Sequence, residues 1–166
     1  MWKRRGFTLV EVVIGALLIV AGGGALLFGM YYTGLHATYL RDEQAAINVA
    51  EGRLQQLTAA SFATLVSAPA DQTCLFEDTN CNGILDAGED INGNIQLDSE
   101  PLTNGRVAIQ IHPVAGQPTM LDLRAAVCWT FRGRQIGEGA AGAPCTNQDG
   151  NWWVDSPAVV TTRVAQ

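Results

Sequence analysis

In residues 78–89, oxygen-bearing side chains recur at fixed spacing. They are Asp78, Asn80, Asn82, Asp86 and Glu89. Calcium prefers six to eight oxygen ligands, and a loop with this spacing supplies them from its side chains and from the backbone carbonyl of its seventh residue, here Ile84. Gly83 stands where such a loop turns sharply. The spacing therefore predicts a calcium site in which Glu89 binds through both oxygens and Asp86 binds directly or through water.

This segment resembles the EF-hand loop, and a second half-repeat follows it. Its candidate ligands are Asp90, Asn92, Asn94 and Asp98. The half-repeat resembles the tandem calcium repeats of exported proteins, but Ile95 replaces the expected glycine and Pro101 the closing glutamate. We therefore expect it to assist the first ion or to hold a second, weaker one. The simpler alternative is a solvated acidic loop, because eight acidic residues lie between positions 71 and 100 and no basic residue lies between Arg53 and Arg106.

A separate candidate site lies near the N-terminus, at Glu11. Glu11 is the one charged residue in positions 7–32. As a helix this run measures about 39 Å, and about 20 apolar residues span a bilayer. Because basic residues occupy positions 3–5, the segment before the run should stay cytoplasmic and the rest of the chain outside. A secretory signal has a shorter apolar run of about 7–15 residues. A carboxylate within a membrane helix indicates a functional site, whereas Thr8 and Glu11 also have the spacing of a capping box.

The N-terminal residues carry a family resemblance. Lys3-Arg4-Arg5-Gly6-Phe7-Thr8-Leu9-Val10-Glu11 resembles the prepilin-type leader of type IV pilins and type II secretion pseudopilins. The resemblance implies that a prepilin peptidase cleaves between Gly6 and Phe7 and methylates the new amine of Phe7. It also implies that Glu11 pairs with this amine on a neighbouring subunit when inner-membrane assembly machinery builds a filament from pilin or pseudopilin subunits. Residues 49–57 are similar to the matching helix of minor pilins of the type IV pilus modification class and of I-type minor pseudopilins.

These motifs divide the chain into regions. We expect a leader at 1–6, a transmembrane or filament-core helix at 7–33, an amphipathic helix at 34–58, a linker with the acidic calcium loop at 59–105, and an antiparallel β head at 106–166. Within the first helix, Gly22-Gly23-Gly24 predicts either local melting, which the resemblance also allows, or close packing of helices through small residues. The apolar face of the second helix comprises Ala46, Val49, Ala50, Leu54 and Leu57.

The fold class expected is α+β, with the long N-terminal helix packed on a C-terminal antiparallel sheet of roughly three to five strands. Candidate strands are residues 106–111, limited by Pro113, then 121–131, a short return strand after the turn at 132–134, 152–154 and 159–164. Residues 137–151 read as a loop. The tryptophans at 129, 152 and 153 are expected in the core or on a sheet face, and an exposed Trp152-Trp153 pair would contact a neighbouring subunit.

Four cysteines fit an exported domain. We predict disulfides between Cys74 and Cys81 and between Cys128 and Cys145, although the sequence permits three pairings. A disulfide-closed C-terminal loop also agrees with the pilin resemblance. A zinc site is the alternative, but no Cys-x-x-Cys pair or nearby histidine completes four ligands.

The composition and the motifs argue against some classes of function. The net charge of −6 and the sparse basic residues argue against a nucleic-acid partner. No Ser/His/Asp or Cys/His set is evident, so an enzyme is not expected. The first expectation is a minor pilin or pseudopilin, held in the inner membrane with a periplasmic head and then assembled into a filament. Retractable pili, secretion pseudopili and DNA-uptake pili all fit. The alternative is a membrane-anchored, exported, calcium-dependent binding or adhesion module.

Overall fold

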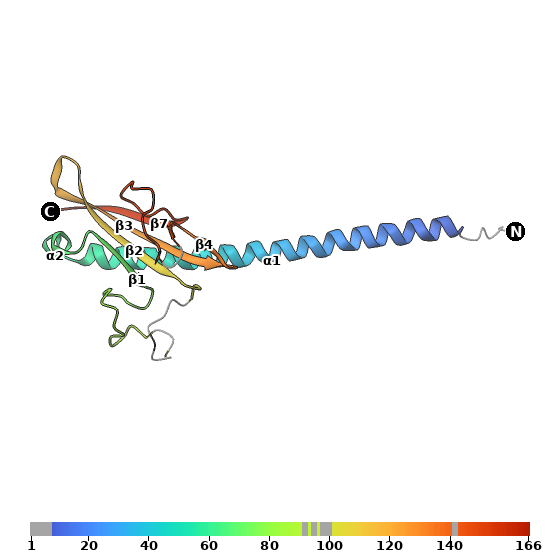
Figure 1. Ribbon diagram of the computed structural model, residues 1–166, viewed down its shortest axis with the longest axis horizontal. Helices are drawn as coiled ribbons and strands as arrows, with labels where there is room; N and C mark the ends of the chain where they lie inside the picture. Colours follow the sequence, from blue (N-terminus) through green and yellow to red (C-terminus); the bar gives the residue numbers. More distant parts are fainter. Residues whose placement is uncertain (1–7, 91–92, 94–95, 97–100, 141–142) are drawn as a thin grey trace. The chain divides into compact units, whose positions relative to one another are not determined.

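The computed structural model describes residues 8–90, 93, 96, 101–140 and 143–166. The chain divides into two units at Leu40/Arg41. Helix α1 (Leu9–Ala59) supplies the described part of the first unit and continues into the second (Figure 1). Each unit is described by itself.

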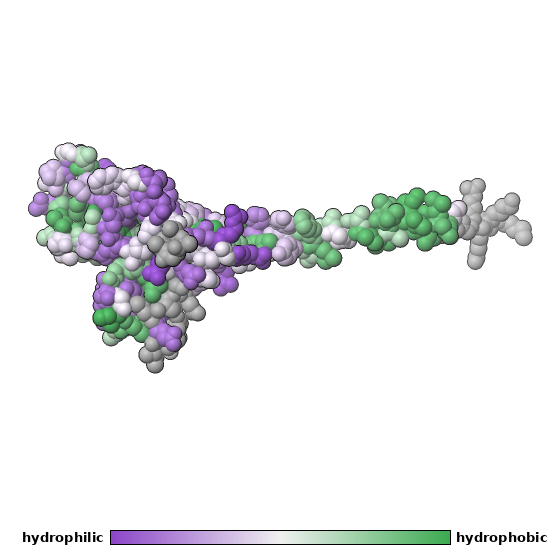
Figure 2. Space-filling model, in the orientation of Figure 1, coloured by the Kyte–Doolittle hydropathy of each residue, from purple (hydrophilic) through white to green (hydrophobic). Residues whose placement is uncertain are grey.

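In the first unit, α1 exposes almost every apolar side chain. Its most apolar window has a mean hydropathy of 2.4, and 0% of that window is buried. Figure 2 shows these apolar side chains gathered along the first part of the helix. Among the described residues, α1 is therefore the one helix that is long and apolar enough to cross a membrane.

The helix is continuous through Gly22, Gly23 and Gly24. A Cβ atom added at any of the three would meet nothing within 4 Å. Among the residues that the structure describes, no packing contact therefore requires a small residue there, although each glycine costs about 1 kcal/mol relative to alanine in a helix interior. Whether the segment melts in an assembled filament stays a prediction, since the structure is of a single chain.

In the second unit, α1 buries one face. Ala46, Ala50 and Leu54 are buried, and Arg53 is buried beside them. The spacing of three and four residues places these side chains on one face, as predicted. A short helix, α2 (Phe62–Ser67), follows, and its N-cap residue Ser61 accepts a 3.2 Å hydrogen bond from the backbone N–H of Thr64.

An antiparallel five-stranded sheet forms the rest of the second unit, which confirms the α+β class. Its strands are β1 (Asp71–Leu75), β2 (Arg106–Val114), β3 (Gln117–Phe131), β4 (Arg134–Ile136) and β7 (Ala158–Ala165). The order is β1-β2-β3-β4, and β7 also pairs with β3. Two short strands, β5 (Gly139–Ala140) and β6 (Ala143–Pro144), pair with each other.

The two faces of the sheet are covered by different elements. On β3, Leu123, Ala125 and Val127 alternate with Ala126 and Cys128, and all five are buried. Residues 123 and 125 pair with Thr162 and Val160 of β7, which line a depression together with Leu54 and Gln55 of α1. The odd-numbered residues of β3 therefore face α1, because successive side chains in a strand point to opposite faces. The even-numbered face is covered by the loop that follows β6.

Several expected boundaries are corrected. Strand β2 continues past Pro113 to Val114, with a shift in register between those two residues. Proline is tolerated there because the contacts from the β1 side end at Ile111, whose N–H donates to the backbone oxygen of Ala70. At Pro113, among the described residues, β2 therefore pairs with β3 alone. The turn at 132–134 is confirmed, with φ angles of +51° at Arg132 and +76° at Gly133. Residues 152–154 are not a strand, and β1 and α2 were not expected, nor were the short strands β5 and β6 within the expected loop at 137–151.

Candidate functional site

The candidate calcium loop begins at Asp78, three residues after the last residue of β1. A disulfide joins Cys74 of β1 to Cys81 within the loop, with their Cα atoms 5.2 Å apart, as predicted. Gly83 has a φ of +74°, which agrees with the sharp turn expected at that position. The loop is therefore tied to the edge of the sheet at its beginning and reverses direction at Gly83.

Three of the proposed ligand side chains meet at one atom. Oδ2 of Asp86 accepts hydrogen bonds from Nδ2 of Asn80, at 2.7 Å, and from Nδ2 of Asn82, at 2.8 Å. Both amide groups therefore point toward the same carboxylate. A cation at Asp86 would compete with these two N–H donors for the same oxygen.

Asp78 organises the turn from the other side. Its two oxygens accept the backbone N–H groups of Asn82, at 3.0 Å, and of Gly83, at 2.9 Å. The side chain is 3% exposed. A carboxylate oxygen has more than one lone pair, so an oxygen that accepts an N–H group can also bind a cation.

Glu89 closes the loop. One carboxylate oxygen accepts the hydroxyl and backbone N–H of Thr79, at 2.5 and 2.8 Å, and the other accepts the N–H of Asp86, at 2.9 Å. The hydrogen bond from the Thr79 hydroxyl, followed by the bonds from backbone N–H groups, holds the pKa of Glu89 below its ordinary value, and burial acts in the opposite direction. Glu89 thus joins the first and last parts of the loop.

Arg53 of α1 donates hydrogen bonds to the backbone at the start of the loop. This residue was not identified from the sequence. Its Nη2 donates to the backbone oxygens of Phe76, at 2.7 Å, and Asp78, at 2.8 Å. Burial lowers the pKa of Arg53, while the nearby carboxylates of Asp78 and Glu89 raise it. The signal was present in the helix pattern, because position 53 lies three residues after Ala50 on the buried face.

The donor set is one of carboxylate, amide and backbone oxygens. Among the described residues, no group of three or more His, Cys, Asp and Glu side chains is placed to hold a metal ion. A cation in this loop would therefore depend on Asn80, Asn82 and the carbonyl of Ile84 as well as on the acids. This oxygen-only set suits calcium rather than zinc.

The second half-repeat is described only in part. Asp90 accepts a 2.7 Å hydrogen bond from the backbone N–H of Gly93. The other candidates, Asn92, Asn94 and Asp98, lie outside the described residues.

At the N-terminal end, Gly6 and Phe7 also lie outside the described residues. Thr8 and Glu11 form the capping box. Oε2 of Glu11 accepts the backbone N–H and the hydroxyl of Thr8, both at 3.0 Å, and the Thr8 hydroxyl accepts the N–H of Glu11 at 3.3 Å. In the single chain, Glu11 therefore begins α1 by satisfying the backbone of its own helix.

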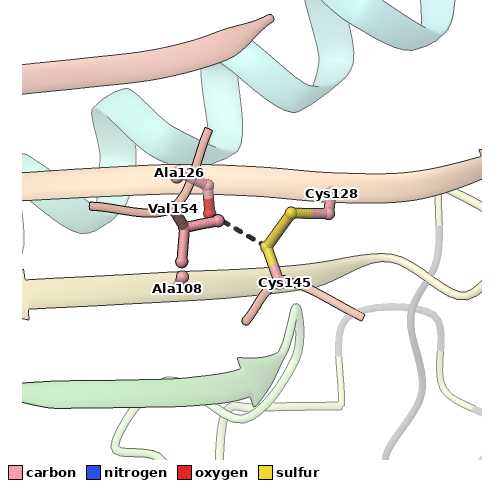
Figure 3. Packing of buried hydrophobic residues seen from close by; sticks show 5 residues of the cluster. All are labelled: Ala108, Ala126, Cys128, Cys145 and Val154. Carbon is pink, nitrogen blue, oxygen red and sulfur yellow. Dashed lines mark hydrogen bonds between the residues drawn. A yellow bond between two sulfur atoms is a disulfide. The ribbon is translucent and has the colours of Figure 1, made fainter. Parts of the chain in front are cut away.

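The second predicted disulfide, Cys128–Cys145, joins β3 to the loop that covers the even-numbered face (Figure 3). Its two sulfur atoms pack with Ala108, Ala126 and Val154 in one buried cluster. A Cβ atom added at Gly137 would lie 2.7 Å from Sγ of Cys128. The bridge therefore packs directly against the backbone at Gly137.

The three tryptophans expected in the core or on a sheet face differ in burial. Trp129 is 1% exposed and belongs to the core. Trp153 is half-buried, and the guanidinium of Arg124 lies 5.5 Å from its ring centroid. Trp152 is 72% exposed, so the pair expected from the sequence is only half on the surface.

No family model, no curated protein and no solved structure matches the chain. The N-terminal residues, the architecture and the geometry of the loop are therefore the features that bear on function. Helix α1 followed by the antiparallel sheet is a pilin-like architecture.

Proposed function

We propose that the protein is a minor pilin or pseudopilin, a structural subunit of a type IV pilus-like or type II secretion filament. The observation that carries the proposal is that α1, apolar and exposed from Leu9 onward, continues as the helix that packs in an α+β head. A single helix thus provides both an apolar segment that is exposed among the described residues and a continuous helical connection to a folded domain. The leader resemblance at residues 3–11 supports the same conclusion.

Glu11 gives this proposal a chemical basis. A carboxylate in the bilayer costs several kcal/mol, and an α-amine from another chain offsets that cost. After cleavage by a prepilin peptidase, the methylated amine of Phe7 supplies that charge. Glu11 then favours a subunit that has found a neighbour over one that is alone in the membrane.

The proposed location follows from the same features. Before assembly, the subunit lies in the inner membrane with its head in the periplasm, where disulfides persist. The assembly machinery then adds it to the filament. Its partners are other pilin or pseudopilin subunits, the peptidase and the assembly machinery.

We also propose that calcium stabilises the head. Asp78, Asn80, Asn82, Asp86 and Glu89 would hold the ion together with the carbonyl of Ile84. The ion would supply positive charge to a loop in which Arg53 is the nearby cation. Exported domains meet millimolar calcium, so a site with a dissociation constant of about 0.1–1 mM would be filled.

Intact mass spectrometry of the native chain from sheared filaments and from washed membranes tests the processing and the assembly. Loss of residues 1–6 with the gain of one methyl group, found in filaments, supports a pilus subunit. The same mass found in membranes alone supports a pseudopilin or an assembly-priming subunit. A chain that keeps residues 1–6 contradicts the filament proposal.

In that last case the second candidate is a membrane-anchored, exported, calcium-dependent binding or adhesion module. The exposure of Asn80, Asn82 and Asp86 favours it, because an ion held there would lie at the surface of the head.

A further inference from the structure

The face of the sheet opposite α1 carries a cavity of about 360 Å³. Its walls come from β1, β2 and the loop between Cys145 and Val154. Volumes of about 300–1,000 Å³ are typical of small-molecule sites, in which a few polar groups fix the orientation of the ligand. The lining side chains that a ligand would meet are Asp71 and Thr73 of β1, Gln110 of β2, and Asn147 and Trp152 of the loop.

Trp152 is held in an unfavourable conformation. Its φ angle is +80°, a region that bulky residues rarely adopt, and its indole is 72% exposed. Both features cost free energy, so surrounding contacts must maintain them. The backbone oxygen of Trp152 accepts a 2.9 Å hydrogen bond from Nε2 of Gln110.

Gln110 is the anchor of this arrangement. Its side chain is 2% exposed. Its Nε2 also donates to Oδ1 of Asp71 at 3.0 Å, and its Oε1 accepts the N–H of Val154 at 2.8 Å. One buried amide therefore fixes both the Trp152 backbone and the Asp71 carboxylate, and places the indole and the acid at the same cavity.

Two polar side chains, His112 and Asp71, line the cavity beside the indole. His112 makes an edge contact with Trp152, with ring centroids 5.7 Å apart. Its Nε2 is buried and, among the described residues, has no hydrogen-bond partner, although Oδ1 of Asp71 lies 3.4 Å away. The Asp71 side chain is 61% exposed, so its carboxylate is open to a ligand.

We propose that this cavity binds a neutral saccharide. The apolar face of a pyranose ring stacks on the exposed indole of Trp152, and its hydroxyl groups hydrogen-bond to Asp71 and to the polar side chain of Thr73. A rigid indole beside a carboxylate and neutral polar groups suits a ligand that is apolar on one face and hydroxylated around its rim.

An organic cation fits less well. Aromatic cages surround a cation with several rings. Trp153, the neighbouring indole, lies outside the cavity, in a second depression where it meets Arg124. An anion is disfavoured by Asp71.

The test uses the full chain in micelles of lauryldimethylamine oxide, because glycoside detergents would compete. The probes are the β-1,4-linked tetramer of N-acetylglucosamine, cellotetraose and maltotetraose, followed by tryptophan fluorescence and calorimetry. We expect saturable binding of at least one probe. The first probe represents cell-wall and chitin-type glycans, and the other two represent glucans, so the responding probe identifies the source.

Trp152→Ala should weaken that binding about ten-fold or more, whereas Trp152→Phe should retain part of it. Asp71→Asn is a second variant at the rim. Val66→Ala, which shortens an exposed side chain on α2, is the matched control and should bind as the natural chain does. Circular dichroism establishes that each variant is folded. The absence of saturable binding by all three probes overturns the proposal, and so does unchanged binding by folded Trp152→Ala.

Discussion

Nη2 of Arg53 lies 2.8 Å from the backbone oxygen of Asp78, so a buried helix residue holds the first residue of the candidate calcium loop. The same nitrogen donates to Phe76 at 2.7 Å. Lysine has a single ammonium group on a flexible stem and cannot reproduce the planar arrangement of donors in arginine.

Arg53→Ala should therefore destabilise the second unit by about 2–3 kcal/mol, because it leaves buried carbonyl groups without a charged donor. Arg53→Lys should recover part of that loss. Denaturant unfolding of the full chain in micelles measures both effects. Arg41→Ala, at an exposed position of the same helix, is the control and should change stability little. Equal effects of Arg41→Ala and Arg53→Ala would contradict the structural role of Arg53.

Calcium should raise the unfolding temperature of the second unit. At a calcium concentration of about 100 times the dissociation constant, the stabilisation is about 2.7 kcal/mol. Glu89→Gln should remove most of this increase, because it replaces the carboxylate that closes the loop. Glu51→Gln makes the same substitution at an exposed position of α1 and should keep the full response. Thermal unfolding with calcium and with a chelator is the measurement. A natural chain that responds to neither would contradict the calcium proposal and leave the filament proposal standing.

Glu138 should make the stability of the second unit depend on pH. Its carboxylate accepts the backbone N–H groups of Asp155, at 2.9 Å, Asp149, at 3.0 Å, and Gln148. These bonds, the one from Asp155 first, hold the pKa of Glu138 below its ordinary value of 4.5. The unfolded chain then binds the proton more readily than the folded chain does. The contribution is present above pH 4.5 and is lost as pH falls through the lower folded-state pKa.

The corresponding test compares unfolding temperatures at neutral and acid pH, with a chelator present so that calcium binding does not contribute. Glu138→Gln should be less stable than the natural chain near pH 7 and should lose less stability on acidification. If the two chains show the same pH profile, the backbone bonds to Glu138 do not contribute as described.

Two substitutions at the start of α1 separate helix capping from assembly. Thr8→Ala removes the hydroxyl of the capping box and should weaken the helix end by about 1 kcal/mol, without changing the charge of Glu11. Glu11→Gln keeps a hydrogen-bond acceptor but removes the charge that the proposed amine contact requires. We expect the Thr8→Ala subunit to be present in sheared filaments. We expect the Glu11→Gln subunit to be processed normally but to be absent from the filaments. If both variants enter filaments equally, capping is the main role of Glu11.

Alanine substitutions at Gly137 and Gly133 should differ in their effect on stability. Its φ angle is +90°, and a Cβ there would lie 2.7 Å from Sγ of Cys128. Gly133 also has a positive φ, +76°, but a Cβ there would meet nothing within 4 Å. Both alanine variants carry the backbone cost of about 1–2 kcal/mol, whereas Gly137→Ala must also displace the disulfide. Gly137→Ala should therefore be clearly the less stable of the two in denaturant unfolding.

The elements that follow local pattern were predictable. The spacing of Ala46, Ala50 and Leu54 identified the buried face of α1, and the Arg132-Gly133 turn identified the hairpin of β3 and β4. Both disulfide pairs were predicted. In each case the residues that define the feature are close in sequence or belong to a short list of alternatives.

The features that were missed depend on distant contacts. Strand β1 has little apolar alternation, and its pairing with β2 defines it. Arg53 is buried because it bonds to carbonyl groups more than twenty residues away. The aromatic run at 152–154 resembled a strand, but Gln110 of β2 bonds to its backbone and holds it as a loop. Local propensity is overridden in these places by tertiary contacts.

Strand β7 is the last described strand to leave the ribosome, yet it pairs with the middle of β3, from Met120 to Val127. Until β7 emerges, that edge of β3 has unpaired N–H and C=O groups that another unfinished chain could join. A cell that makes this protein therefore benefits from keeping nascent copies apart until synthesis is complete.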